Sequence, residues 1–198
     1  MSTAPSRGFQ SVLAMFLRVI GLPGAARRLE GTHSAISERQ RAAEERGFVL
    51  RVVQPGLAGL MDGSVSTLAP IFATAFITNV SFDAFRVGMA TAVGAGISMA
   101  FAEGLSDNGA LTGRGNPFAR GGVTGVMTFI GGSLHTLPFL IPNIHAALYA
   151  AYIIVAIELV AIAAIRHRFF GTNWAVSIAQ VVGGGALVFA AAVIFGAA

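Results

Sequence analysis

The sequence of 198 residues contains no cysteine, and all of its 13 basic residues are arginine. Without cysteine the chain cannot form disulfides, iron–sulfur clusters or thiolate zinc sites. Charged residues make up only 11%, whereas a soluble domain usually has about 25%. Because 55% of the residues are hydrophobic, we exclude an ordinary cytosolic enzyme and a disordered tail. We predict an all-α integral membrane protein that is not an enzyme.

Charge is unevenly distributed along the chain. Residues 1–51 hold eight arginines and four glutamates, whereas residues 52–198 hold five arginines and five acids. This division predicts a basic cytoplasmic arm over residues 1–47 and a transmembrane domain over residues 48–198. A basic arm beside an apolar body favours an anionic lipid surface over nucleic acid as its partner.

The arm contains two predicted helices. Residues 9–22 are apolar over too short a run to span a bilayer and are interrupted by Arg18, which favours an amphipathic helix in the membrane interface. A signal peptide is the alternative, and Arg18 argues against it. Ser37 and Gln40 fit a capping box, which predicts a polar helix that begins there and runs to Arg51.

The transmembrane domain has five apolar stretches near the length of about 20 residues that a spanning helix needs. They are residues 52–77, 84–103, 121–141, 145–165 and 175–197. Only Pro142, Asn143 and Ile144 separate the third stretch from the fourth, so these two are expected to form a tight helical hairpin.

Arginine placement predicts the orientation of the spans, because basic residues gather on the cytoplasmic side. With five spans, eight arginines fall on the side of the amino terminus, namely Arg39, Arg41, Arg46, Arg51, Arg114, Arg120, Arg166 and Arg168. The opposite side has only Arg86, at helical spacing from Asp83. We expect a cytoplasmic amino terminus and a carboxyl terminus outside.

Asp62 is the most informative polar residue, because ionisable groups inside spans are costly and point to function. It lies ten residues into the first span, about 15 Å along the helix axis and near mid-depth. Ser66 follows one turn later on the same face. Pro70 has no N–H, so the carbonyl of Ser66 loses its helical partner. A buried aspartate paired with a neighbouring donor is the alternative reading.

Met99 and Glu103 are four residues apart on one face of the second span. With the expected orientation, Glu103 lies at the cytoplasmic mouth and Met99 one turn deeper. A soft thioether with a hard carboxylate suits Fe²⁺ better than Mg²⁺ or Ca²⁺. The alternative is that Met99 only packs and Glu103 reaches towards the interface.

Two further ionisable residues lie in apolar sequence. Glu158 in the fourth span is a second ligand, a proton carrier or a hydrogen-bonded partner of another helix. His135 in the third span is a candidate proton relay, although a structural histidine is the simpler interpretation.

Several motifs resemble the vacuolar iron transporter family over about residues 48–198. They are Gly-Leu-Met-Asp-Gly-Ser-Val-Ser-Thr-Leu-Ala-Pro at 59–70, Gly-Ala-Gly-Ile-Ser-Met-Ala at 94–100, Gly-Leu-Ser-Asp-Asn-Gly-Ala-Leu-Thr-Gly-Arg-Gly at 104–115, His-Thr-Leu-Pro-Phe-Leu-Ile-Pro at 135–142 and Gly-Gly-Ala-Leu-Val-Phe-Ala-Ala at 184–191. The chain is most similar to the membrane part of the bacterial membrane-bound ferritin (erythrin–vacuolar iron transport) type. It has no recognisable ferritin-like domain.

The resemblance implies a homodimer with five spans per subunit that exports Fe²⁺ or Mn²⁺ from the cytoplasm by proton antiport. It matches Asp62, Met99 and Glu103 to the metal-binding residues of the family, at a site shared across the dimer interface. It also implies a multi-pass protein of the bacterial inner membrane, with no tightly bound cofactor. In this scheme Asp62 takes up a proton once the ion has left.

Two departures from the family pattern narrow these expectations. Only residues 104–120 stand where plant members carry a long acidic insert, and the arm is too short for a ferritin-like bundle. Any iron-collecting ferritin-like protein must then be a separate partner. The alternative function is a non-transporting membrane anchor or assembly subunit for such a partner.

Overall fold

The computed structural model describes residues 23–110 and 112–196, which fall into two compact units divided after Gly47. The amphipathic helix expected at residues 9–22 lies outside the described part of the chain. In the first unit the structure describes helix α2, Pro23–Phe48. The prediction that a helix begins at Ser37 was wrong, because Ser37 lies inside α2. Residues 23–36 contain alanine, arginine, leucine and glutamate, which favour helix.

The described part of the second unit is helical and contains no strand. Its elements are η1 (Val49–Val53, a π-helical turn), α3 (Gln54–Ser66), α4 (Leu68–Thr78), α5 (Ser81–Gly104), α6 (Pro117–Leu134), η2 (Leu137–Leu140, a 3₁₀ turn), α7 (Ile144–Phe170) and α8 (Trp174–Gly196). The prediction of an all-α protein is confirmed for these residues.

Four helical stretches of the described residues are long and apolar enough to cross a membrane. They are Ile36–Thr78, Ser81–Gly104, Ile144–Phe170 and Trp174–Gly196. The expected third span, residues 121–141, differs from the helix found there. Helix α6 begins at Pro117, ends at Leu134 and gives way to the 3₁₀ turn η2. Pro138 explains this end, because proline lacks an N–H and disfavours α-helix in the residue before it.

The first of these stretches is interrupted in its apolar part. Helix α3 ends at Ser66, Thr67 forms a turn and α4 begins at Leu68. This break lies three residues before Pro70, as the loss of a hydrogen-bond donor at Pro70 predicts. Asp62 therefore lies one turn before a discontinuity, on a helix segment that is distinct from α4.

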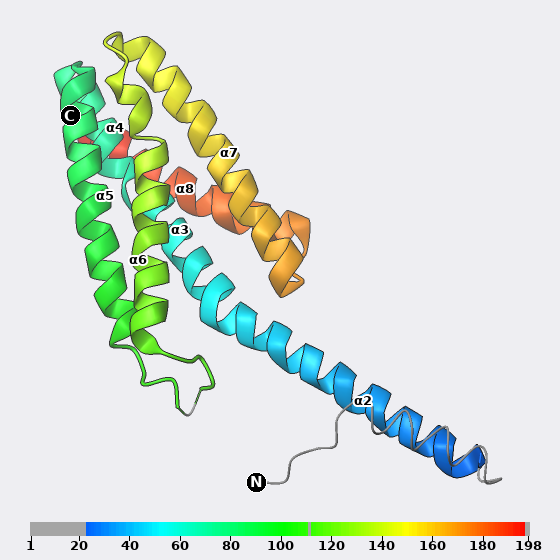
Figure 1. Cartoon of the computed structure of the whole chain (residues 1–198). Coiled ribbons are helices and arrows are strands. Elements are labelled where there is room, and N and C mark those ends of the chain that lie inside the picture. The colour runs from blue at the N-terminus through cyan, green and yellow to red at the C-terminus, as the bar shows by residue number, and fades with distance from the viewer. Residues whose placement is uncertain (1–22, 111, 197–198) are drawn as a thin grey trace. The chain divides into compact units, whose positions relative to one another are not determined.

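Helix α6 packs closely between α3 and α5, and Figure 1 shows α5 and α6 side by side. Small residues make this approach possible. A Cβ on Gly63 of α3 would collide with the backbone carbonyl of Thr128 on α6, and one on Gly125 of α6 would meet the carbonyl of Gly96 on α5. Close backbone contact through small residues is the usual way in which helices associate in lipid.

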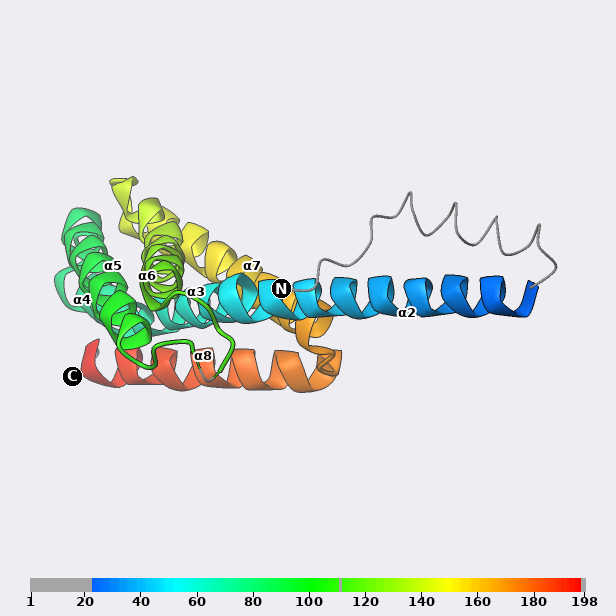
Figure 2. The same cartoon turned by 60° about the horizontal axis from the view of Figure 1, so that its bottom comes forward.

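A second packing region joins α4, α7 and α8. Phe72 of α4 is 1% exposed and contacts the aromatic rings of Phe139, Tyr152 and Phe189. Figure 2 shows α8 extending from the end of α7 to α4, and α8 packs against both helices. This aromatic cluster holds α4 on one side of the break at Thr67, while the glycine contacts hold α3 on the other.

Candidate functional site

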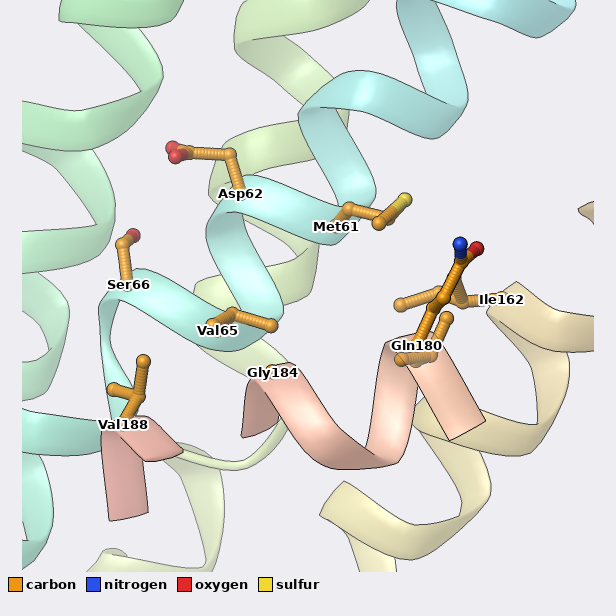
Figure 3. A pocket seen from close by; sticks show the side chains of 9 residues that line it. Met61, Asp62, Val65, Ser66, Ile162, Gln180, Gly184 and Val188 are labelled. Atoms are coloured by element: carbon orange, nitrogen blue, oxygen red, sulfur yellow. The ribbon is translucent and has the colours of Figure 1, made fainter. Parts of the chain in front are cut away.

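Asp62 lies on α3 beside a pocket of about 500 Å³. The pocket is lined by Met61, Asp62, Val65, Ser66, Ile162, Gln180, Val181, Gly184 and Val188, which come from α3, α7 and α8. Figure 3 shows the side chains of Asp62 and Ser66 pointing the same way from α3, whereas Met61 points towards Ile162. The residues that line the pocket thus include one carboxylate, one hydroxyl, one amide and one thioether among apolar side chains. In Figure 3 the carboxylate of Asp62 extends from α3 away from Met61 and Gln180.

Asp62 differs from every other acid of the second unit in having no basic partner among the described residues. Glu103 and Asp107 each pair with Arg114 and Arg120. Asp83 pairs with Arg86 at 3.8 Å, as its helical spacing predicts, and Glu158 pairs with His135. A half-buried carboxylate with no counter-charge is electrostatically costly, and a bound cation would remove that cost.

The other polar residues that line the pocket differ in whether their side chains are already hydrogen-bonded. The amide oxygen of Gln180 accepts a hydrogen bond from Arg166 at 2.6 Å, so only its NH₂ group is free of this contact. Ser66 is exposed, and its backbone carbonyl has no helical donor four residues later, because Pro70 lacks an N–H. Sequence reasoning identified Asp62 and Ser66 but missed Met61 and Gln180.

Met99 is half-buried on α5 and is not among the residues that line the pocket of Asp62. One copy of the chain therefore does not bring the two predicted ligands together. Among the described residues, no group of three or more histidine, aspartate or glutamate side chains is placed to hold a metal ion. Met99 stays a predicted ligand.

Glu103 lies at the end of α5 in a cluster of two acids and two arginines, which we call the arginine clasp (Glu103, Asp107, Arg114 and Arg120). Its Oε1 accepts hydrogen bonds from Arg114 at 2.7 Å and from Arg120 at 2.8 Å. The side chain of Arg120 is only 1% exposed. An ion that binds Glu103 must displace these guanidinium groups or share the carboxylate with them. The metal-binding role of Glu103 stays a prediction.

The other acid of the clasp holds the loop between α5 and α6. Burial tends to raise the pKa of Asp107, but the N–H of Gly109, the charge of Arg120 and hydrogen bonds from Arg114 and Thr112 lower that pKa overall. Gly109 adopts φ +73°, a left-handed conformation that glycine tolerates best. The clasp thus carries equal numbers of opposite charges and ties Asp107 and Arg114 of the loop to Glu103 and Arg120 on the helices beside it. Sequence reasoning missed its arginines as partners of Glu103.

His135 and Glu158 meet in the interior of the unit, where they are 0% and 5% exposed. The Nδ1 of His135 lies 2.9 Å from Oε2 of Glu158, and its Nε2 lies 2.8 Å from the hydroxyl of Thr67. Thr67 is the residue at which α3 and α4 are interrupted. Sequence reasoning named His135 and Glu158 separately, and the structure pairs them. It had no signal for Thr67.

Comparison with protein-family models, with curated proteins and with solved structures gave no match to this chain.

Proposed function

We propose that this chain is a membrane transporter that moves a divalent transition-metal ion, Fe²⁺ or Mn²⁺, out of the cytoplasm in exchange for protons. The observation that carries the proposal is the isolated carboxylate of Asp62. It lies beside a pocket, within an apolar helical stretch that is long enough to cross a membrane, and it is the one acid of the described second unit without a basic partner.

The elements around Asp62 support a site that binds an ion reversibly. Pro70 has no N–H, so the carbonyl of Ser66, one turn after Asp62, lacks its usual helical donor. Discontinuous helices at mid-depth are typical of the ion sites of secondary transporters. One carboxylate with few neutral donors suits transient binding, because a site that moves its ion must also release it.

Selectivity for a transition metal rests on sulfur. A thioether prefers Fe²⁺ to the hard cations Ca²⁺ and Mg²⁺, and Met61 and Met99 are the candidates. Met61 lines the pocket in the same chain. Met99 would reach the ion in the proposed homodimer, where both copies contribute ligands across a twofold axis. The resemblance of residues 48–198 to the vacuolar iron transporters supports the same ion, orientation and bacterial inner membrane.

The test is metal transport by the purified full chain in proteoliposomes, with a pH dye inside. The wild type is expected to carry Mn²⁺ or Fe²⁺ with an opposing proton flux, and Asp62→Asn is expected to lose transport. Asp83→Asn is the matched control, because Asp83 is an exposed acid paired with Arg86 on α5.

Two results would contradict the proposal. One is a wild type that carries no divalent metal in either direction, as a membrane anchor for a ferritin-like partner would behave. The other is Asp62→Asn with wild-type transport. Met99→Leu and Met61→Leu, which keep side-chain volume, separate the two sulfur candidates: the variant that loses Fe²⁺ transport identifies the ligand, and unchanged transport in a variant excludes that methionine.

A further inference from the structure

The pocket beside Asp62 is larger than a single metal ion needs. Its volume is about 500 Å³, whereas a water molecule takes up about 30 Å³ in the liquid. An ion with a first shell of about six waters would therefore leave more than half of the pocket empty. Pockets of about 300–1,000 Å³ are typical of sites that bind small organic molecules.

The walls of the pocket are mostly aliphatic. Five of the nine lining residues carry purely aliphatic side chains or none, namely Val65, Ile162, Val181, Gly184 and Val188. Such walls offer no ligands to an ion, because divalent metals bind oxygen, nitrogen or sulfur. An apolar body, by contrast, gains dispersion contacts along them. The size and the walls of the pocket therefore both favour an organic ligand.

The charge of the pocket lies at one edge. Asp62 is the one charged residue among the nine that line the pocket. In Figure 3 its carboxylate extends from α3 on the side of Ser66, away from Met61 and Gln180. The oxygen of Gln180 already accepts a hydrogen bond from Arg166 at 2.6 Å. In one chain, the polar groups of the pocket thus do not converge on one point, as the ligands of a resident metal centre would.

The number of charges also matters. Asp62 has no basic partner among the described residues, so a monovalent cation beside it would give a neutral pair. A divalent ion held by one chain alone would leave one positive charge unbalanced in an apolar helical stretch, which is costly. A single organic cation is the ligand whose charge one chain can balance.

We propose that the pocket is a binding site for monovalent organic cations with an apolar body, such as quaternary ammonium or phosphonium ions. The positive group lies towards the carboxylate of Asp62, and the body packs along Val65, Ile162 and Val181. This function goes beyond metal export and does not depend on it, because it needs only Asp62 and the walls that one chain provides.

The α8 side of the pocket offers a way to change its volume alone. Gly184 lines the pocket, and a Cβ added there would meet nothing within 4 Å. A larger side chain can therefore be accommodated at this position without pushing α8 away from its neighbours. A Cβ on Gly183 also meets nothing within 4 Å, but Gly183 is not among the lining residues.

The test measures how radiolabelled tetraphenylphosphonium binds to the immobilised full chain in detergent. The wild type should bind it, and Asp62→Asn should bind at least tenfold more weakly because the negative charge is gone. Asp62→Glu keeps the charge and should retain most of the affinity. Uptake of the cation by detergent micelles is the same for all variants, so the differences between them report the pocket.

Tetraphenylborate is the matched control ligand, because it has the same shape and the opposite charge. Measured separately on the wild type, it should not bind above the level of Asp62→Asn with tetraphenylphosphonium. This comparison needs no variant to fold. Equal binding of the two ions by the wild type would overturn the inference, because binding would then not depend on the carboxylate.

Gly184→Leu tests whether the apolar body lies in the pocket. It should weaken tetraphenylphosphonium binding at least tenfold, whereas Gly183→Leu, the matched control, should bind as the wild type does. A metal ion is small enough to reach Asp62 beside the leucine, so Gly184→Leu should lose less affinity for Mn²⁺ than for tetraphenylphosphonium. Equal binding of tetraphenylphosphonium by the two leucine variants would overturn the inference.

The outcomes separate this inference from the proposed metal export. Tetraphenylphosphonium binding that requires Asp62, in a wild type that carries no divalent metal, overturns the metal function and supports the organic-cation site. Metal transport that requires Asp62, together with equally strong tetraphenylphosphonium binding by the wild type and Asp62→Asn, overturns only the organic-cation site.

Discussion

The sequence predicts both Asp62 and Glu103 as metal ligands, but in the structure the two carboxylates differ in whether they have a basic partner. Asp62 lies beside a pocket with no basic partner among the described residues, whereas one oxygen of Glu103 accepts hydrogen bonds from two arginines. The comparison shows that depth in a span does not decide whether a carboxylate is free to bind a cation. The position of the nearest guanidinium group decides it.

The difference has an energetic basis. The arginine clasp neutralises its own charges, so its formation satisfies acids and arginines together, and removal of one partner leaves the rest uncompensated. Asp62 gains no such compensation from the described residues. Evolution rarely keeps an uncompensated carboxylate inside a membrane unless it has a function. The clasp therefore fits a structural role, and Asp62 fits cation binding.

The largest expected effect comes from giving Asp62 the partner that it lacks. Ser66 lies one turn after Asp62 with its side chain on the same side, and an acid followed by a base four residues later forms a favourable pair. Ser66→Arg should pair with Asp62 and abolish metal transport, although no proposed ligand is removed.

The control for this change is Ser66→Ala, which should transport almost normally. Transport is measured in proteoliposomes after equal insertion of both variants has been checked. Normal transport by Ser66→Arg would mean that metal transport does not require an unpaired carboxylate at Asp62. The difference in basic partners between Asp62 and Glu103 would then not explain which of them binds the metal.

The sequence predicted the helical class, the place of Asp62 inside an apolar stretch and the loss of a hydrogen-bond donor at Pro70, because these follow from local composition and from the missing N–H of proline. It did not predict that the helix breaks at Thr67 or that Asp62 has no basic partner among the described residues. It misjudged residues 121–141 as one long helix, since a hydrophobic count does not register the turn that Pro138 imposes. It also missed the start of the polar helix, because a capping pattern at Ser37 occurs inside a longer helix.

The sequence could not predict which side chains on different helices pair with one another, and the reason is a different one. His135 and Glu158 are 23 residues apart, and Thr67 is 68 residues from His135. No periodicity joins positions on different helices. The same holds for Arg120 and Glu103, which are 17 residues apart. One sequence shows which side chains are costly in a membrane but not which of them meet.

The next largest effect concerns the backbone that carries Asp62. A Cβ on Gly63 would overlap the carbonyl of Thr128 on α6, so Gly63→Ala should force α3 away from α6 and lower thermal stability and metal binding together. Gly94→Ala is the control, because a Cβ on Gly94 of α5 meets nothing within 4 Å. Equal stability of the two variants would show that Asp62 does not depend on this contact.

A smaller effect is expected from the clasp. Arg120→Met removes a buried guanidinium and should destabilise the protein by about 3 kcal/mol, within the range for breaking a buried ion pair. Glu103→Gln in the same background should cost less than it does alone, because the two residues contact each other. The free energies of unfolding are measured by denaturation of the wild type, the two single variants and the double variant, and additive losses would mean that the pair in the structure is not coupled.

The smallest expected effect is the response of the clasp to acid. The hydrogen bonds and positive charges around Asp107 lower its pKa from the ordinary value of 3.8. A carboxyl with a lowered pKa stabilises the folded state above its unfolded pKa, and this contribution is lost only as pH falls through the lower folded value. The loop should therefore keep its shape from about pH 7 down to about pH 5, where an unperturbed carboxylate is also still ionised, and it should loosen only below the ordinary pKa.

A nitroxide spin label on Ala110→Cys can report this, because the native chain has no cysteine and Ala110 is exposed. Its mobility should stay constant until the solution is strongly acidic, whereas in an Asp107→Asn background the label should be mobile throughout. An increase in mobility already near pH 5 would mean that Asp107 titrates above its ordinary range and that the arginines do not hold it.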